Sequence, residues 1–313
     1  MNENEQAEEL HPHEPASQRS TRQTQSYLRG LFADHGLDPK AKMGQNFLVD
    51  INLLDFIVRE SDLAPIDAVL EIGTGTGGLT DRMAEHVGAV VSVELDHDFH
   101  RMATTILGPR ENILLIQGDA LKHKNEMNPE VLAALRDFGN ARGCMRVKLV
   151  ANLPFVIATP AICNLLLTPI PFERMVVMVQ WEIGERLTST VGTRDYGSLA
   201  VLVQSLADTE ILRKVGPGNF WPRPKVDSAI VKITPNAEKR ARVGDPKKFR
   251  NFLRDLYTHR RKTLRQGLIG WPQGRKEKAF VDAKLVELGI DGSIRAEALS
   301  IEDHLRLSAA FGE

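Results

Sequence analysis

Short apolar runs alternate with stretches of helical spacing over much of the chain. Apolar runs of about four to eight residues are typical of strands that are buried on both faces of a sheet. They lie at residues 68–72, 89–95, 112–117, 147–152 and 174–180. The stretches between and after them predict helices over residues 79–87, 97–107, 160–167, 181–189 and 196–207. Strands and helices in this order predict an α/β fold whose mostly parallel sheet is covered on both faces.

The two ends of this region follow other patterns. Residues 209–215 and 227–234 predict two last strands, which we expect to form an antiparallel pair. Residues 53–58 have the spacing of a helix that buries one face. Residues 1–26 are polar and are predicted to be a disordered tail. The α/β domain is therefore expected to span residues 27–235.

A change of composition separates the C-terminal part of the chain. Residues 235–246 are charged and rich in turn-forming residues, which predicts a linker. Beyond it, apolar residues keep the spacing of one helix face at Phe249, Phe252, Leu253, Leu256, Tyr257, Leu264 and Leu268. Residues 236–313 are therefore expected to form a small all-α domain.

The composition is that of an ordinary globular protein, with 42% hydrophobic and 26% charged residues among 313. The two cysteines, Cys144 and Cys163, form no CxxC pair, so neither a disulfide framework nor a zinc site is expected. No apolar run reaches the roughly 18 residues that span a bilayer, and the N-terminus carries no apolar signal core. We expect a cytoplasmic protein without a membrane partner.

Charge is distributed unevenly although the formal net charge is only −1. Residues 213–278 contain 19 Lys and Arg but 5 Asp and Glu. Such asymmetry indicates a surface that faces a polyanion, with a solvated charged face as the alternative. Four arginines share a second stripe of the predicted C-terminal helix and are candidates for phosphate contacts: Arg250, Arg254, Arg261 and Arg265.

A glycine-rich segment follows the first strand and opens the next helix. It reads Gly-Thr-Gly-Thr-Gly-Gly from Gly73, and glycines such as Gly73 and Gly75 let a ligand approach the backbone closely. Glu94 ends the next strand, 21 positions after Gly73, where its carboxylate can accept hydrogen bonds from ribose hydroxyls. The segment predicts a nucleotide-type ligand. It also fits the GxGxxG fingerprint, so a nicotinamide dinucleotide remains an alternative.

Three residues at strand ends favour S-adenosylmethionine over a dinucleotide. Glu71 precedes the glycine loop, where a carboxylate suits the ammonium end of methionine better than a pyrophosphate. Asp119, after the third strand, is placed to accept a hydrogen bond from the adenine amine. Asn152 ends the fourth strand, and ligands of open α/β sheets sit at the carboxyl ends of the strands. Singly, these residues could instead be a surface charge, a helix cap and a turn residue.

Residues 152–155 read Asn-Leu-Pro-Phe and suit one exocyclic amine. The Asn152 side-chain carbonyl and the Leu153 backbone carbonyl can both accept hydrogen bonds from an NH2 group. Pro154 stiffens the turn, and Phe155 offers a flat face to a base, which must be unstacked to reach such a site. Phe220 could hold the other face of the base, with ordinary packing as the alternative.

In this order and spacing, the segments resemble the small-subunit ribosomal RNA adenine dimethyltransferases. The resemblance extends from about Lys40 to the C-terminus. It rests on GQNFL at 44–48, EIGTGTGGLT at 71–80, VELD at 93–96, GDA at 118–120, NLPF at 152–155, YGSLAVLVQ at 196–204, FWPRPKVDSAIV at 220–231 and RRKTLR at 260–265. It implies a class I S-adenosylmethionine-dependent methyltransferase domain, which is Rossmann-like, and a small helical domain that binds rRNA.

The resemblance also implies roles and partners. Asn46 and Leu48 would contact the cofactor, with Glu94 at its ribose, Asp119 at its adenine ring and Asn152 at the catalytic end. The activity implied is methyl transfer from S-adenosylmethionine to the exocyclic amines of two adjacent adenines in a loop near the 3′ end of small-subunit rRNA. The partner is then the small ribosomal subunit. We expect no metal requirement and a monomer.

Three features depart from the family pattern. The glycine loop reads GTG where many members have GPG, Phe155 replaces the more frequent Tyr, and the N-terminal segment extends beyond the usual start. Two other functions therefore stay open. One is an RNA-binding ribosome-assembly or transcription factor that uses the methyltransferase fold as a scaffold. The other is an adenine methyltransferase of 23S rRNA or DNA.

Overall fold

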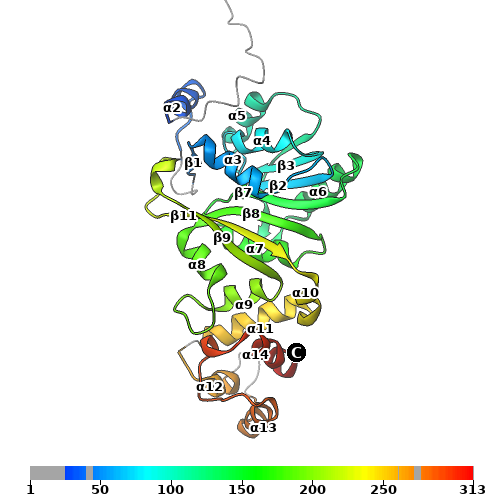
Figure 1. Cartoon of the computed structure of the whole chain (residues 1–313), viewed down its shortest axis with the longest axis vertical. Helices are drawn as coiled ribbons and strands as arrows, with labels where there is room; N and C mark the ends of the chain where they lie inside the picture. Colours follow the sequence, from blue (N-terminus) through cyan, green and yellow to red (C-terminus); the bar gives the residue numbers. More distant parts are fainter. Residues whose placement is uncertain (1–24, 40–44, 260, 271–275, 313) are drawn as a thin grey trace, which may run out of the picture.

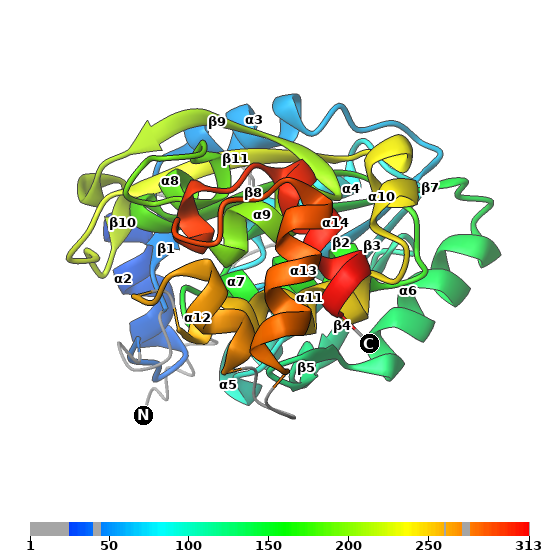
Figure 2. The ribbon, with the colours of Figure 1, turned by 90° about the horizontal axis from the view of Figure 1, so that it is seen from below.

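The computed structural model describes four segments of the chain, residues 25–39, 45–259, 261–270 and 276–312. The predicted tail, residues 1–26, lies outside the described residues except for Gln25 and Ser26, which begin helix α2 (Gln25–Asp34). Figure 1 shows a central sheet with helices on both sides and α11–α14 gathered at one end. Figure 2, seen from that end, shows these C-terminal helices in front of the sheet.

A seven-stranded sheet forms the centre of the fold, in the order β4-β3-β2-β7-β8-β11-β9. Its strands are β2 (Asp67–Ile72), β3 (Ala89–Glu94), β4 (Ile113–Gln117), β7 (Arg146–Asn152), β8 (Phe172–Gln180), β9 (Ala207–Val215) and β11 (Ser228–Pro235). The strands from β4 to β8 are parallel, whereas β11 is antiparallel to both β8 and β9. The predicted parallel sheet and its antiparallel end are confirmed. The strand order reverses between β2 and β7, which is where open α/β sheets form their ligand crevice.

Alternate residues of the central strands point to opposite faces of the sheet, and each face has its own core. Leu149 and Ala151 of β7 belong to one hydrophobic cluster, and Val150 between them belongs to the other. Val176 and Val177 of β8 divide in the same way. Burial on both faces explains why these strands read as unbroken apolar runs in the sequence.

The predicted helices of the α/β region are all present. They are α3 (Ile51–Glu60), α4 (Gly78–Ala84), α5 (His97–Leu107), α7 (Ala158–Leu167), α8 (Trp181–Thr188) and α9 (Ser198–Gln204). A further helix, α6 (Pro129–Ala141), was not among the predicted ones, although Val131 and Leu135 have helical spacing. Two short antiparallel pairs complete this part, β1 (Phe47–Leu48) with β10 (Phe220–Trp221), and β5 (Leu121–His123) with β6 (Glu126–Met127).

The C-terminal part is helical, as expected. Its helices are α10 (Ala237–Val243), α11 (Pro246–Thr258), α12 (Leu264–Ile269), α13 (Lys278–Leu288) and α14 (Ile301–Phe311). Most of the predicted linker, residues 235–246, is helix α10. Asn236 begins this helix by accepting a hydrogen bond from the Lys239 amide at 3.1 Å, and charged residues then populate its exposed surface.

The prediction of a single helix from Phe249 to Leu268 is wrong, because one helix ends at Thr258 and another begins at Leu264. The Thr263 hydroxyl accepts from the Gln266 amide at 3.4 Å and caps the new helix. The amides of Leu264 and Arg265 donate to carbonyls of residues 294 and 292, at 2.7 and 3.0 Å. These bonds satisfy the first turn of α12 and fix the break.

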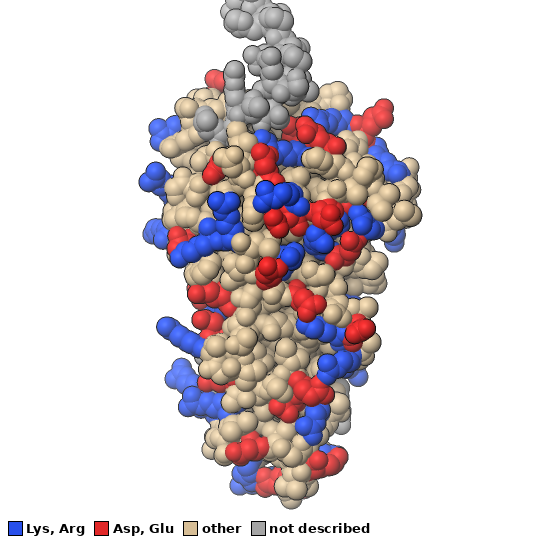
Figure 3. Space-filling view, in the orientation of Figure 1, with Lys and Arg blue, Asp and Glu red and all other residues tan. Residues whose placement is uncertain are grey.

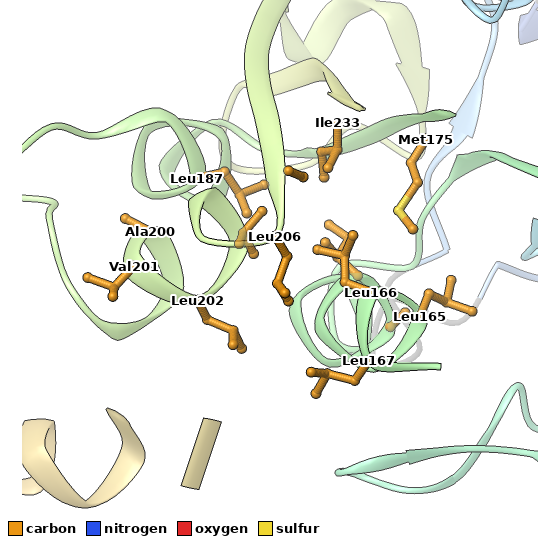
Figure 4. Packing of buried hydrophobic residues seen from close by; sticks show 14 of the residues in the cluster. Leu165, Leu166, Leu167, Met175, Leu187, Ala200, Val201, Leu202, Leu206 and Ile233 are labelled. Carbon is orange, nitrogen blue, oxygen red and sulfur yellow. The ribbon is translucent and has the colours of Figure 1, made fainter. Parts of the chain in front are cut away.

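One hydrophobic cluster crosses the predicted domain boundary at residue 235. It joins Val231 of the sheet, Leu166 of α7 and Val201 of α9 to Phe249 of α11 and Phe311 of α14. Figure 4 shows the part of this cluster in which side chains from α7, α8 and α9 converge beside the sheet. The helical part therefore shares a continuous core with the α/β part.

Part of the cationic excess of residues 213–278 is neutralised within the protein. Several of its cations pair with acids outside that range, at Lys232–Glu210, Lys239–Asp208, Arg242–Glu302 and Arg265–Asp282. On the face in Figure 3, acidic and basic side chains are interspersed. These four pairs offset four of the 14 excess positive charges, so most of the charge asymmetry remains. In the described segments, each helix is too short or too polar to traverse a bilayer.

Candidate active site

A cavity of about 210 Å³ lies at the carboxyl ends of β2, β3, β4 and β7. Every residue predicted to bind the cofactor or to act in catalysis lines it: Asn46, Leu48, Glu71, Gly73, Gly75, Glu94, Asp119, Asn152, Leu153, Pro154 and Phe155. Two backbone hydrogen bonds continue the parallel ladder beyond the strands, from Gly73 N to Val93 O and from Gly118 N to Glu94 O, each 2.8 Å. They hold the strand-end residues in register around the cavity.

The glycine loop is shaped for close approach of a ligand. Gly73 has φ +90° and Gly75 φ +55°, a region that side chains rarely adopt. A Cβ at Gly73 would lie 3.2 Å from the Pro154 ring, and one at Gly75 would lie 3.1 Å from the Phe47 ring. The loop is therefore closed in by the NLPF turn on one side and by β1 on the other. Any side chain added here would displace a wall of the cavity.

Glu94 braces the glycine loop from the end of β3. Its Oε2 accepts from the Gly75 amide at 2.9 Å, and its Oε1 accepts from the Asp96 amide at 3.0 Å. The residue is buried, and this burial raises the pKa of its carboxyl group despite the two backbone donors. Each oxygen retains capacity for another donor, as the predicted bonds to ribose hydroxyls require.

Glu71 is the most deeply buried acid of the cavity, with 1% of its surface exposed. Its Oε2 accepts from the hydroxyls of Thr80 at 2.5 Å and Ser92 at 2.6 Å, and Ser92 also contacts the Thr74 hydroxyl at 2.6 Å. Desolvation raises the pKa of Glu71 to about 8, although the two hydroxyl bonds oppose this shift. A cation bound in the cavity would favour the ionised form, as the predicted contact with an ammonium group requires.

Replacing Glu71 by glutamine is expected to make stability less sensitive to pH. Because the folded pKa of about 8 exceeds the value of 4.5 for a free carboxyl, the wild type loses stability as pH rises between these values. The slope can reach about 1.4 kcal/mol per pH unit. Urea unfolding at pH 5, 6.5 and 8 should show a growing advantage of Glu71→Gln, whereas Glu111→Gln, at an exposed position, should show none. A constant difference between wild type and Glu71→Gln would contradict the raised pKa.

Asp119 lies at the exposed end of the cavity, after β4. Its Oδ1 accepts from the Leu121 amide at 2.8 Å, and its carbonyl accepts from the Asn128 side chain at 3.1 Å. These bonds fix the turn that leads into the β5–β6 hairpin. The second carboxylate oxygen can then meet a ligand, in keeping with the predicted contact to the adenine amine.

The NLPF turn is held from three directions. The Asn152 side-chain amide donates to the Asn46 carbonyl at 3.1 Å, which turns the amide oxygen away from β1. The Leu153 amide donates to the Met178 carbonyl at 3.2 Å, and the Leu153 side chain is buried. No donor in the described segments bonds the Leu153 carbonyl. The turn thus leaves two carbonyl oxygens for a hydrogen-bond donor in the cavity.

Some apolar side chains that line the cavity were not predicted from the sequence. Phe47 is a wall of the cavity beside Gly75, and it lies within the GQNFL segment that carries the resemblance. Leu95 and Val156 also line the cavity and are 51% and 70% exposed. Leu95 directly follows the strand-end residue Glu94, and Val156 directly follows the NLPF turn, and these positions are the signal that could have found them.

The expected stacking role of Phe220 is wrong in this structure. Its side chain is 2% exposed and packs in a core cluster with Val215 and Ile230. Its backbone pairs with Leu48 across the β1–β10 ribbon. Phe220 does not line the cavity, because its ring is buried in this core cluster.

The prediction that the four arginines share one face of a single helix is also wrong. Arg250 donates to the Asn125 carbonyl and the Asn164 side chain, at 3.1 and 3.0 Å, and Arg254 pairs with Asp255 at 2.8 Å. Arg265 lies on the separate helix α12 and pairs with Asp282 through two bonds of 2.5 and 2.7 Å. Only Arg261 of the four is exposed and without an ion pair among the described residues.

The titratable side chains give no sign of a metal centre. In the part of the chain that the structure describes, His, Cys, Asp and Glu form no group of three that could hold a metal ion. The residues at the strand ends instead fit S-adenosylmethionine. Two buried carboxylates with raised pKa values, a glycine cradle and an exposed Asp119 match its cationic, ribose and adenine parts.

Known proteins share this fold, and their sequences align with most of this chain. Residues 37–312 match the family of ribosomal RNA adenine dimethylases. The chain is 39% identical to the ribosomal RNA small subunit methyltransferase A of Pediococcus pentosaceus, over 89% of this chain and 92% of the relative. The protein of that name from Pelotomaculum thermopropionicum is 36% identical, over 91% and 95%.

Two solved structures are similar to this chain in fold. A dimethyladenosine transferase from Plasmodium falciparum superposes with a TM-score of 0.67 and 25% identity, over 85% of this chain and 97% of that one. The 23S rRNA methyltransferase ErmE superposes with a TM-score of 0.59 and 25% identity, over 86% and 100%. The fold is thus the Rossmann-like methyltransferase fold with a helical C-terminal part, and the chain belongs to the ribosomal RNA adenine dimethylase family.

Proposed function

We propose that the protein transfers methyl groups from S-adenosylmethionine to the exocyclic amines of two adjacent adenines in a loop near the 3′ end of small-subunit rRNA. The observation that carries this proposal is the Asn152–Phe155 turn, which faces the glycine loop across one cavity. The names of the relatives, ribosomal RNA small subunit methyltransferase A, support the substrate class. We further expect a monomer that acts in the cytoplasm on the small ribosomal subunit.

Asn152 and Leu153 would position the amine. The nitrogen of an adenine amine is a poor nucleophile because its lone pair is shared with the ring. In the first transfer, hydrogen bonds from its two protons to the Asn152 Oδ1 and the Leu153 carbonyl would localise the lone pair on nitrogen and direct it into the cavity. One proton is lost to solvent after each transfer, so in the second transfer the one remaining proton would bond one of these two acceptors. Orientation of this kind can account for up to about 7–11 kcal/mol of a barrier. Bound S-adenosylmethionine supplies an electrophilic methyl group on a sulfonium that departs as a neutral thioether.

Phe155 would hold the target base by stacking. It lines the cavity at the turn that follows β7 and is partly exposed. RNA sequence is usually recognised on bases that are splayed out of loops and stacked on aromatic side chains. An unstacked adenine with its amine at Asn152 would place its ring near Phe155, three residues farther along the turn.

The cations that meet rRNA phosphates are expected at the turn between α11 and α12. Arg261→Ala should weaken binding to small subunits and reduce the slope of log K against log salt by about one. Lys262→Ala should act similarly, because both side chains are exposed there. The matched control is Arg265→Ala, whose guanidinium is occupied by Asp282; it should lower the melting temperature and leave the slope unchanged. A slope that responds to Arg265 and not to Arg261 would refute this assignment.

Analysis of the methylated nucleoside tests the proposed reaction directly. After incubation of unmethylated small subunits with the protein and S-adenosylmethionine, digestion of the rRNA to nucleosides should yield dimethyladenosine. Mapping should place it at two adjacent positions near the 3′ end. Monomethyladenosine alone, or product elsewhere in the rRNA, would contradict the proposed reaction.

A further inference from the structure

Helix α2 packs into an aromatic cluster next to the cavity, although it precedes the family match, which begins at residue 37. Its inward side chains, Leu28 and Phe32, are 0% and 1% exposed. They share a cluster with Phe47, Phe99 and Met102, which come from β1 and α5. Figure 1 shows α2 at the end of the molecule that carries β1. The helix is therefore an integral part of the fold on the cavity side.

Phe32 is the centre of this cluster. Its ring centroid lies 5.0 Å from that of Phe47, 5.3 Å from Phe99 and 5.3 Å from Trp221. The contacts with Phe47 and Phe99 are edge-to-face, at 78° and 75°, a favourable geometry for aromatic pairs. Phe47 and Phe99 also stack on each other at 4.9 Å. One side chain of α2 thus touches three elements, β1, α5 and β10.

The segment that Phe32 supports contacts both halves of the site. Phe47 packs against the glycine loop at Gly75, and the preceding Asn46 carbonyl accepts the bond from the Asn152 side chain. Gln45 adds a bond of 3.5 Å to Asp96, the residue that caps α5. A displacement of residues 45–48 would therefore reach the cofactor loop and the amide of Asn152 together.

The backbone of this segment is weakly held on its own. β1 and β10 contain two residues each, and a bond of 2.9 Å from the Val49 amide to the Asn219 carbonyl extends the ribbon. Isolated two-stranded ribbons are marginal in water, so side-chain packing must fix their position. Phe32 is the side chain that packs on both strands, through Phe47 and Trp221.

We infer that Phe32 is a positioning residue for methyl transfer, which holds β1 so that Phe47 closes the glycine loop and Asn46 aims Asn152. The inference rests on the proposed function for its catalytic part and on the cavity alone for its cofactor-binding part. It assigns a role to a helix that the family match does not cover. Phe32 touches neither cofactor nor substrate, and its effect is transmitted through Phe47 and Asn46.

The test compares Phe32→Ala with Phe311→Ala in the full chain. Both replacements remove a buried ring, and Phe311 lies in α14 and does not line the cavity. Phe32→Ala is expected to raise the Kd for S-adenosylmethionine by titration calorimetry, and to lower kcat on small subunits, each on the order of tenfold or more. Phe311→Ala should destabilise the protein with the Kd near the wild-type value. Phe32→Leu retains much of the volume but loses the edge-to-face ring contacts, so it should raise the Kd by about threefold. It serves if Phe32→Ala does not fold.

Two results would overturn the inference. One is a wild-type Kd and kcat in a folded Phe32→Ala protein, or in Phe32→Leu if only that variant folds. The other is an equal change of Kd in Phe311→Ala, which would mean that general destabilisation is responsible. Failure of the proposed function would look different: the wild type would bind S-adenosylmethionine and methylate no rRNA, and the calorimetric comparison would still decide the role of Phe32.

Discussion

Asn152→Ala is expected to lower kcat for methyl transfer by on the order of 100- to 1,000-fold, comparable to the loss of one preorganised hydrogen-bonding group in other active sites. The side-chain carbonyl would no longer accept from the adenine amine, so the lone pair would be neither localised nor aimed. The Kd for S-adenosylmethionine should change by no more than about threefold, because Glu71, Glu94 and the glycine loop remain in place. Single-turnover kinetics on unmethylated small subunits and titration calorimetry measure the two quantities separately.

Asn112→Ala is the matched control. Its side chain also donates to backbone carbonyls, those of Ala84 and Val87 at 2.8 and 3.1 Å, but it does not line the cavity. This variant should retain the wild-type kcat. An Asn152→Ala protein that loses cofactor binding and turnover to the same degree would show that Asn152 shapes the cofactor site and has no separate role in aiming the amine.

Gly73→Ala is expected to raise the Kd for S-adenosylmethionine by on the order of 100-fold, since a shift of the loop by even about 1 Å is costly at this distance from the chemistry. Two causes combine. The residue has φ +90°, which disfavours any side chain, and the new Cβ would meet the Pro154 ring at 3.2 Å. Relief of that contact would move either the glycine loop or the NLPF turn. Titration calorimetry of the purified variant gives the result directly.

Gly108→Ala separates these two causes. Gly108 also has positive φ, +61°, but a Cβ there would meet no atom within 4 Å. This variant should lose stability from backbone strain and keep its affinity for S-adenosylmethionine. Equal losses of affinity in Gly73→Ala and Gly108→Ala would assign the effect to strain, and would remove the contact with Pro154 from the account.

The strand-end residues could be predicted from sequence because the fold itself brings them together. Parallel strands place their carboxyl ends on one edge, so Glu71, Glu94, Asp119 and Asn152 meet although they are far apart in the chain. The apolar runs locate the strands, and burial on both faces makes those runs distinctive. The cofactor contacts expected of Asn46 and Leu48 rest only on the family resemblance, since nothing in local spacing places β1 beside the glycine loop.

The C-terminal cations could not be assigned from spacing. A helical repeat continues across residues 258–264, so Arg250 and Arg265 appear to share one face, yet the chain turns between them. The signal for the turn was present, since Thr263 followed three residues later by Gln266 is a helix-start pattern. Ion-pair partners such as Asp282 lie in another helix, and no local pattern reveals such pairs.

The role predicted for Phe220 was wrong and helix α6 was not predicted, and the reasons differ. An aromatic residue beside Pro222 reads equally well as a stacking platform or as core, and only the pairing of β10 with β1 decides for the core. Helix α6 carries apolar residues at helical spacing, with Val131 and Leu135 buried, and it also has a strong start signal. Asn128 is followed by Pro129, and the Asn128 side chain accepts from the Glu130 amide at 3.0 Å. Attention to caps as well as periodicity would have found this helix.

Labelled methyl transfer from S-adenosylmethionine tests the central claim most directly, with unmethylated small subunits, large subunits and naked duplex DNA as parallel substrates. Incorporation into small subunits alone is the predicted result, and it would separate this enzyme from adenine methyltransferases of 23S rRNA or DNA. Incorporation into large subunits or DNA would contradict the substrate assignment. Cofactor binding without incorporation into any substrate would contradict catalysis itself and would support an RNA-binding scaffold, with Phe155 in place of the more frequent Tyr as the first residue to exchange.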